Sequence, residues 1–513
     1  MEKRFPLYFS VLFFLFGSGL FISAYFGNFD GSEAWYSNDI YLLTRGEKPY
    51  IDFFYHRLPL FLYSYFPLNF GFEMTWFNLR LVSAFYAFCA FIVLFLVMKV
   101  KVDKRFVLLG ALLFLLNFHG LHIYSTVQSY SIVSLIYLLV IFSCHSSVPS
   151  LLSGIFIAVC CATAQWMRYP IDYLPIVYLS FVFVFYRKSW PTLICLLLIY
   201  CFIHLVYFYF FKSDFFIYDV LLGMAPIKEQ SGVALAQVLT GRALDDWLRF
   251  KWDQWIVLGV RWFFPFFIFG IPAFGYWLKK NGLGLFFRKI IQDKRLFLSL
   301  FFVFGNTAMY FIASEGHVVQ MYFVFPIMIY LFIRLLNAIM KSIPADVKQF
   351  VTLILLFLIL FSSFLFDRFF KLDKNSRDIA VAEQVGKIFS SHCDSSQILF
   401  TFNPIIAFTS KMRVFSGAEF DVFGYYPNLS PLLARKYHLL TQDDVLRGLK
   451  EFDICGVYLD ARVFGEKHSG VRLRAISKEI IDITKSNFDY TDYSTSYLSA
   501  LRGPVAIGLK KNR

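Results

Sequence analysis

Most of the first 367 residues form apolar windows long enough to cross a lipid bilayer, with short polar turns between them. A transmembrane helix needs about 20 predominantly apolar residues. Windows that approach or meet this length lie near residues 7–26, 77–99, 105–120, 122–143, 150–165, 169–186, 190–211, 256–278, 296–314, 317–338 and 348–367. Because a chain inside lipid must satisfy its own backbone, such windows fold as helices. The pattern predicts a polytopic α-helical membrane protein with about eleven transmembrane helices.

Two polar segments interrupt the apolar pattern, at residues 27–76 and 212–255. In 212–255, apolar residues recur at roughly helical spacing beside charged ones. This spacing predicts short helices that lie on the membrane surface.

After residue 367 the pattern changes to alternating helices and strands. Helical periodicity covers residues 377–392, 443–452 and 470–488, and buried-strand patterns cover 397–402, 454–460 and 504–511. This alternation is typical of a compact α/β domain. We therefore predict two domains, a membrane domain at 1–367 and an α/β domain at 368–513.

Composition agrees with the membrane class, since 58% of the residues are hydrophobic, only 16% are charged and the mean hydropathy is +0.59. The net charge of +14 has the sign found in nucleic-acid-binding proteins, but the basic residues are spread over short loops. We therefore interpret them as topology signals and expect no nucleic-acid partner.

The basic loops predict an orientation. With Lys3 and Arg4 in the cytoplasm, basic loops follow the second, sixth, eighth and tenth windows, and only the loop at 144–149 lacks Lys and Arg. This orientation predicts a multi-pass inner (plasma) membrane protein with a cytoplasmic N-terminus. Residues 27–76, residues 212–255 and the C-terminal domain then lie on the extracytoplasmic (periplasmic) side.

The eight cysteines show no metal-binding spacing, so we expect no metal site. Only Cys393 and Cys455 lie in the polar C-terminal part. They either form a disulfide, if this side is oxidising, or remain two buried thiols.

The segment at 29–63 has more carboxylates than a connector between two membrane helices needs. Its ionisable residues include Asp30, Glu33, Asp39, Asp52, His56 and Arg57. Carboxylates and a cation held together at a membrane surface favour a reaction on a charged lipid. The alternative is a solvated loop.

The order of motifs in this segment resembles the first extracytoplasmic loop of the GT-C glycosyltransferases, which use lipid-linked sugars. It is most similar to the branch of aminoarabinose transferases, lipopolysaccharide-core transferases and protein O-mannosyltransferases. The family shows Asp-Glu-Ala-x-Tyr, then Gly-x-x-x-Tyr-x-Asp, then a basic residue before Pro-Leu, then a Gly and an Arg. The corresponding residues are Ser32-Glu33-Ala34-Trp35-Tyr36, Gly46 through Tyr50 to Asp52, Arg57 before Pro59-Leu60, Gly71 and Arg80.

The resemblance implies roles for these residues. A carboxylate, Asp30 or Glu33, removes the proton of the acceptor hydroxyl, and Arg57 stabilises the leaving phosphate. Asp52 orients the acceptor or Arg57, and Tyr36, Tyr50 and His56 contribute to binding the lipid phosphate or sugar. Ser32 departs from the family pattern, which has Asp there, and leaves the choice of base open. Direct displacement implies inversion, and neither a metal nor another cofactor is required.

Two more sites match places where the family holds its lipid phosphate or sugar. Arg168 lies between the fifth and sixth windows, with Asp172 as a possible salt-bridge partner. His317 and Tyr322 precede a proline at the start of the tenth window, where a structural histidine is an equal alternative.

The sequence thus predicts a GT-C-type glycosyltransferase of the cell envelope. It would move a sugar from a polyprenyl phosphate to an extracytoplasmic acceptor such as lipopolysaccharide, another glycan, a lipid or a protein. A transporter or flippase of lipid-linked substrates and a non-catalytic envelope-assembly scaffold are the alternatives.

Overall fold

A computed structural model describes most of the chain. The described residues are 5–27, 31–53, 55, 58–66, 68, 71–144, 150–168, 173–211, 252–253, 266, 270–312, 318–341, 378–394, 396–415, 417–418, 424–427, 429–436, 438–451, 453–459, 478–493 and 505–510. Contacts divide the chain into two compact units. Unit 1 comprises Met1–Tyr25, Arg80–Phe210 and Val233–Phe369, and unit 2 comprises Phe26–Leu79, Phe211–Gly232 and Phe370–Arg513.

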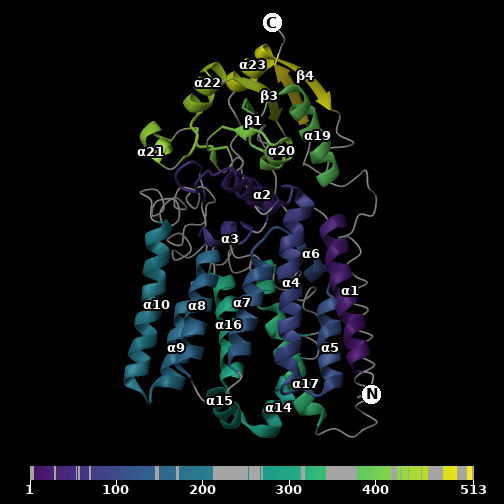
Figure 1. The fold of residues 1–513 in the computed structure, drawn as a ribbon, viewed down its shortest axis with the longest axis vertical. Helices are drawn as coiled ribbons and strands as arrows, with labels where there is room; N and C mark the ends of the chain where they lie inside the picture. Colours follow the sequence, from purple (N-terminus) through teal and green to yellow (C-terminus); the bar gives the residue numbers. More distant parts are fainter. Residues whose placement is uncertain are drawn as a thin grey trace. The chain divides into compact units, whose positions relative to one another are not determined.

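Unit 1 is helical, and most of its long helices run side by side (Figure 1). Its elements are α1 (Phe5–Phe26), α4 (Trp76–Lys99), α5 (Lys104–Leu115), α6 (Phe118–Ser125), α7 (Tyr130–Ser143), α8 (Leu151–Met167), α9 (Leu174–Tyr186), α10 (Trp190–Phe211), α14 (Ile271–Asn281), α15 (Leu283–Gln292), α16 (Lys294–Ile312), the 3₁₀ helix η7 (Val318–Phe323) and α17 (Phe325–Met340).

Several of these helices have the length and composition of membrane spans. Among the described residues, α1, α4 and α10 are each long and apolar enough to cross a bilayer. The pair α5 and α6, bent by 65°, makes a fourth span if it counts as one, and α7, α8, α9 and α17 are shorter apolar helices. These helices identify an integral membrane protein. The total of about eleven spans stays a prediction.

Aromatic side chains join the helices of unit 1. The ring centroids of Phe9 and Phe95 lie 3.6 Å apart, and those of Phe16 and Phe91 lie 4.3 Å apart, which packs α1 against α4. Part of the large phenylalanine content is therefore used in helix-to-helix contacts.

The predicted windows 105–120 and 122–143 were wrong in their boundaries. This stretch contains three helices, α5, α6 and α7. Helix α5 ends at Leu115, and α6 begins two residues before the end of the first window at residue 120. Asn117 explains the break: its side chain accepts a hydrogen bond of 2.6 Å from the Gly120 N–H and caps α6. Similarly, window 317–338 consists of η7 followed by α17. The window at 348–367 and most of the segment at 212–255 lie outside the described residues.

Unit 2 contains a five-stranded mixed sheet in the order β2-β1-β3-β5-β4. The strands are β1 (Ile398–Thr401), β2 (Arg413–Val414), β3 (Ile454–Leu459), β4 (Phe488–Tyr493) and β5 (Val505–Lys510). Strand β1 pairs in parallel with β2 and β3, and β5 pairs antiparallel with β3 and β4. The helices are α19 (Asp378–His392), α20 (Pro404–Ser410), α21 (Pro431–Lys436), α22 (Gln442–Glu451) and α23 (Lys478–Asn487). The predicted α/β character of the C-terminal part is confirmed, although β2, β4, α20 and α21 were not predicted.

The core of this sheet lies along β3, all six residues of which are buried. Val457 packs there with Phe400 and Phe488. Cys455 of β3 forms a disulfide with Cys393, with Cα atoms 5.6 Å apart. Of the two alternatives that the sequence left open, the structure contains the disulfide.

The segment between α1 and α4 belongs to unit 2 and contains α2 (Gly31–Thr44) and α3 (Leu60–Tyr63). Helix α2 packs on α20. The Tyr41 hydroxyl donates a hydrogen bond of 2.9 Å to the carbonyl of Lys411. Trp76, at the start of α4, also belongs to unit 2, and its ring lies 4.8 Å from that of Phe408. The segment that carries the predicted reactive residues is therefore supported by the α/β domain. The domain boundary at 367/368 stays a prediction.

Helices α19 and α20 approach closely at Gly386, and this contact gives a prediction. A Cβ atom at Gly386 would lie 2.7 Å from the backbone carbonyl carbon of Thr409. We expect Gly386→Ala to lower the local free energy of unfolding by about 1–3 kcal/mol, because backbone cannot move aside as a side chain can. Hydrogen exchange of the α19 and α20 amides measures this. Gly275→Ala is the matched control, since nothing lies within 4 Å of a Cβ there; equal exchange in both variants would contradict the prediction.

Candidate functional site

In unit 2, the acidic motif of the sequence forms the start of helix α2. Glu33 lies in the first turn and its exposed fraction is 0%. Asp39, further along α2, is also buried. Buried carboxylates are rare, so both mark α2 as more than a connector.

A tight turn follows α2 and includes the predicted Gly-x-x-x-Tyr-x-Asp motif. Gly46 and Tyr50 have positive φ values of 88° and 68°, and a non-glycine residue at such a φ is strained. Asp52 closes the turn, because its side chain accepts a hydrogen bond of 2.7 Å from the Lys48 N–H. Asp52 thus has a structural contact in addition to its predicted role.

Two predicted binding tyrosines, Tyr36 of α2 and Tyr50 of this turn, are buried. The ring of Tyr36 meets the edge of Phe61 at 4.8 Å, and the ring of Tyr50 lies 5.8 Å from that of Tyr55. These contacts fix the two rings in place.

A residue from the α/β domain, His438, holds the same turn. Its ring hydrogen-bonds to the backbone of Tyr50 and lies near the Asp52 carboxylate. Burial lowers the pKa of His438, while the Tyr50 backbone and Asp52 oppose this shift. The imidazole is therefore neutral at pH 7 and positions Tyr50 without carrying a charge.

The lowered pKa of His438 makes this contact depend on pH. The unfolded state, with a histidine pKa of about 6.5, binds more protons than the folded state between the two pKa values, so stability rises with pH there. We expect the turn at 46–53 to lose protection against hydrogen exchange as the pH falls below about 6.5. His438→Gln should remove this pH dependence. An identical pH dependence in wild type and variant would show that another group is responsible.

In unit 1, the irregular segment η7 is surrounded by polar side chains. The carbonyl of Tyr322 accepts hydrogen bonds from Tyr124 Oη at 2.5 Å and Ser134 Oγ at 3.0 Å, and the carbonyl of Gln320 accepts one from Asn306 Nδ2 at 3.2 Å. Within a membrane bundle, such backbone is tolerated where protein or a cavity satisfies it.

The side chain of Tyr322 joins η7 to the break between α5 and α6. Its hydroxyl donates a hydrogen bond of 3.2 Å to Asn117 Oδ1, and its ring stacks on His119 at 5.3 Å. Gly120 makes this approach possible, because a Cβ there would lie 3.2 Å from the Tyr322 ring. Tyr322 is thus fixed in a polar, buried environment.

Arg168 follows α8 and its exposed fraction is 6%. Its guanidinium donates to Ser129 Oγ at 3.2 Å and to Tyr130 Oη at 3.4 Å, and lies over the rings of Tyr130 and Phe323. Hydroxyl groups and aromatic faces orient a guanidinium. An anion is the ligand that such a group binds best.

The structure therefore groups the predicted residues as follows. Glu33, Tyr36, Tyr50 and Asp52 lie in unit 2, whereas Arg168 and Tyr322 lie in unit 1, where Arg168 contacts the residue next to Tyr322. The other predicted residues lie outside the described residues: Asp30, His56, Arg57, Asp172 and His317.

Two further residues were missed by the sequence reasoning, and Asp39 was named there without a role although it is buried. Asn117 could have been found as a capping residue between two apolar runs. No sequence signal connects His438 to Tyr50, because the contact exists only in the folded unit.

Arg80, which matched the family arginine, is fully buried, and it donates a hydrogen bond of 3.3 Å to the carbonyl of Ala24 near the end of α1. In the described ranges, no group of three His, Cys, Asp or Glu side chains could hold a metal ion.

Comparisons with known proteins give a structural likeness only. No protein-family model and no curated protein matches the sequence. The structure is similar to ArnT from Cupriavidus metallidurans bound to undecaprenyl phosphate, with a TM-score of 0.60, 9% identity and coverage of 99% of this chain and 98% of ArnT. The apo state of the same ArnT gives a TM-score of 0.56 at 8% identity, with the same coverage.

An oligosaccharyltransferase from Archaeoglobus fulgidus, tethered to an acceptor peptide, gives a TM-score of 0.50 at 10% identity. This match covers 96% of the present chain and 73% of the oligosaccharyltransferase. Over nearly its whole length, the chain therefore has the fold of the GT-C membrane glycosyltransferases, as its sequence motifs predicted.

Proposed function

We propose that this protein is a glycosyltransferase that moves a sugar from a polyprenyl phosphate to an acceptor in the cell envelope. The observation that carries the proposal is the likeness, over 99% of the chain, to an ArnT structure that contains undecaprenyl phosphate. A buried carboxylate at the start of α2 and a buried guanidinium beside η7 supply the two kinds of group that the reaction needs.

The proposed reaction is a displacement at the anomeric carbon. The acceptor oxygen forms a bond to this carbon, the bond between the carbon and the phosphate oxygen breaks, and the polyprenyl phosphate leaves. Glu33 or Asp30 takes the acceptor proton. One displacement inverts the anomeric carbon. Arg57 stabilises the leaving phosphate, and Asp52 orients the acceptor or Arg57.

We place the donor phosphate or sugar against Arg168, Tyr322 and His317, with Tyr36, Tyr50 and His56 as further binding residues. Guanidinium groups bind phosphate oxygens in bidentate fashion, which suits Arg168. The assignment rests on their chemistry and on their order in the sequence.

The proposed orientation puts the N-terminus in the cytoplasm and unit 2 outside. The basic residues in the turns of unit 1 support it, because cytoplasmic loops are enriched in Lys and Arg. The disulfide of unit 2 also supports it, since disulfides persist outside the reducing cytoplasm. The acceptor would then be lipopolysaccharide, another glycan, a lipid or a protein on that side.

The proposal is tested by transfer in membranes that contain the wild-type protein, supplied with a panel of radiolabelled polyprenyl-phosphate sugars and envelope acceptors. We expect transfer from one donor, which identifies the sugar. No transfer from any donor, with the protein folded and inserted, would favour a scaffold or a transporter. The serine at position 32, where the family has Asp, is what favours the scaffold alternative.

Arg168 gives a prediction for this assay. We expect Arg168→Gln to lower kcat/KM for the donor by about 10- to 100-fold, because one or two charge-assisted hydrogen bonds to phosphate are lost. Arg168→Lys should recover only part of the loss, because lysine keeps the charge and lacks the planar fork. Ser129→Ala removes a neutral partner and is the control, with a change of a few fold at most. Normal donor kinetics with a lowered stability would assign Arg168 a purely structural role.

A further inference from the structure

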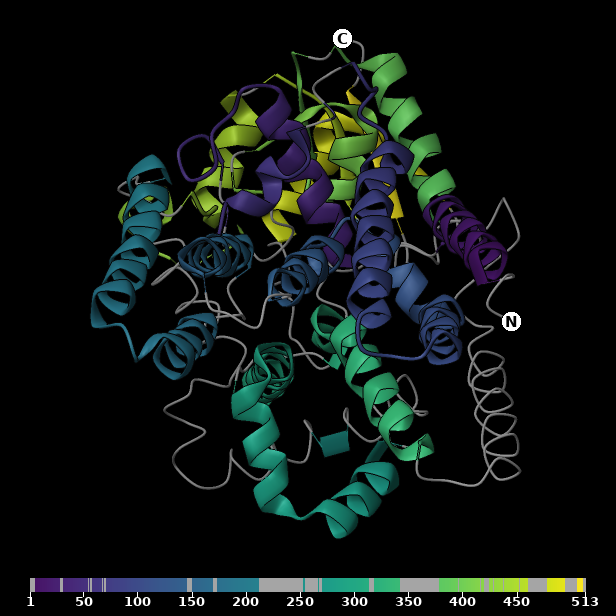
Figure 2. The same ribbon diagram turned by 60° about the horizontal axis from the view of Figure 1, so that its bottom comes forward.

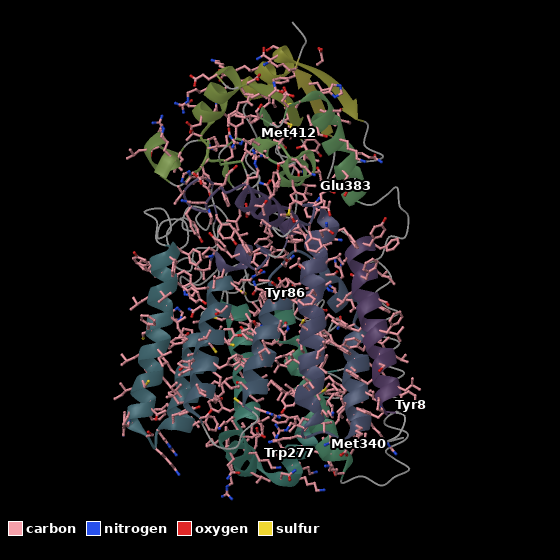
Figure 3. The ribbon with its side chains drawn as sticks, in the orientation of Figure 1. Tyr8, Tyr86, Trp277, Met340, Glu383 and Met412 are labelled. Atoms are coloured by element: carbon pink, nitrogen blue, oxygen red, sulfur yellow. A yellow bond between two sulfur atoms is a disulfide. The ribbon has the colours of Figure 1, made fainter. Side chains whose placement is uncertain are left out.

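Helices α14 and α15 form a surface of unit 1 that the proposed function does not use. They meet at an angle at Gly282, which has a φ of 76° (Figure 2). Neither helix contains a buried residue. They contact α16 and α17 at the end of unit 1 where Trp277 and Met340 lie (Figure 3).

Helix α15 has one apolar face. Leu283, Phe287, Ile290 and Ile291 share one side of an ideal helix, and their neighbour Phe286 packs on Phe274 and Trp277 of α14. Leu283, Phe287 and Ile291 are 58%, 54% and 54% exposed. A helix of ten residues is about 15 Å long, half of the hydrocarbon thickness, so it can lie along a membrane but not cross it.

Basic residues flank this apolar face. Arg288 and Lys289 lie on the polar side of α15, and Lys279 and Lys280 form the last turn of α14. The nearby carboxylate, Asp293, is already engaged, since it accepts hydrogen bonds from Lys101 at 2.8 Å and Arg334 at 2.5 Å. Burial alone would raise the pKa of Asp293, but Arg334 and Lys101 hold it at about 2. Neither helix contains a carboxylate, and of their cations Lys289 lies over the Trp277 ring, with its Nζ 5.2 Å from the ring centroid.

We propose that α14 and α15 form a docking surface for anionic phospholipid headgroups, with the apolar face of α15 placed at the boundary between headgroups and acyl chains. An exposed apolar face flanked by Lys and Arg has this chemistry, and attraction to anionic headgroups adds to apolar burial. Because α15 continues into α16 at Asp293, which is tied to α17, bound lipid also fixes the ends of these two helices. The inference does not depend on which reaction the protein catalyses.

A photo-crosslinking experiment on the full chain tests the proposal. The photoreactive residue p-benzoylphenylalanine replaces Phe287, and the protein is placed in nanodiscs of phosphatidylcholine with a minority of phosphatidylglycerol. We expect crosslinks to phosphatidylglycerol in excess of its mole fraction. The same residue at Phe183, which is exposed on α9, is the positional control and should crosslink in proportion to lipid content.

Charge variants test the cause of the enrichment. The double variant Lys280→Gln and Arg288→Gln should lower the excess of phosphatidylglycerol crosslinks severalfold, because each basic residue near an anionic surface contributes roughly fivefold in affinity. The control double variant, Arg187→Gln and Lys188→Gln, removes the same charge from the turn after α9 and should leave the excess of phosphatidylglycerol crosslinks unchanged. High salt should lower it in the wild type. Crosslinks at 287 that follow the mole fraction, that ignore the charge variant, or that go mainly to another protein would each overturn the proposal.

Discussion

Glu33→Gln is expected to lower the rate of sugar transfer by about 10²- to 10⁴-fold, which is the range that a general base contributes. Glutamine has the shape of glutamate but cannot take the proton from the acceptor hydroxyl. Glu33 is fully buried at the start of α2. The loss should fall on kcat, with little change in KM for the donor. Kinetics with the donor identified in membranes measure both quantities.

Three controls make this prediction specific. Glu73→Gln changes an exposed carboxylate of the same unit and should leave the rate within about twofold, as expected for a weak surface ion pair. Thermal unfolding of Glu33→Gln must match the wild type, so that a folding defect is not mistaken for lost chemistry. If Asp30→Asn abolishes transfer and Glu33→Gln does not, Asp30 is the base; if both variants are active, the proposed role of this motif is wrong.

Replacing Cys393 and Cys455 by serine is expected to lower the local stability of the α/β domain by about 4 kcal/mol. The disulfide joins residues 62 positions apart. Closing a loop of this length lowers the conformational entropy of the unfolded chain, and this loss accounts for about 4 kcal/mol of stability. Because Cys455 belongs to the buried strand β3, the effect should appear as faster hydrogen exchange of the β1 and β3 amides in the full-length protein.

The matched control is Cys201→Ser, which changes an exposed free cysteine on α10 and should not alter exchange in the sheet. In the wild type, reductant should speed up hydrogen exchange of the β1 and β3 amides as the double substitution does. In the double variant, reductant should have no effect. Unchanged exchange after reduction would mean that packing alone holds β3. Resistance of both thiols to alkylation in intact cells would separately support a location outside the cytoplasm.

Long apolar runs were predicted well because their signal is local. The window at 190–211 coincides with α10, and those at 7–26 and 77–99 differ from α1 and α4 by one or two residues. The strands near 397–402, 454–460 and 504–511 were found for the same reason, since each is a short apolar run between turns. The breaks at Asn117 and at η7 were missed, because a single capping residue barely changes the average of a window.

The roles of the candidate-site residues stay predictions. Glu33, Tyr36 and Tyr50, which the motif from Ser32 to Asp52 singled out, all belong to unit 2. Asp52 was assigned to acceptor or arginine binding, whereas its observed contact closes the turn. Such a contact depends on the exact backbone path, which spacing in the sequence does not specify.

The sequence by itself determined that this is a membrane protein with an α/β domain and a motif like that of the GT-C glycosyltransferases, because periodicity, charge in loops and motif order are properties of the chain alone. The tertiary structure decided that α2 rests on α20, that His438 contacts Tyr50, that Cys393 pairs with Cys455, and that Arg168 lies over Tyr130 and Phe323. Most of these contacts join residues far apart in the sequence, and only the packing of the folded units brings such residues within reach of one another.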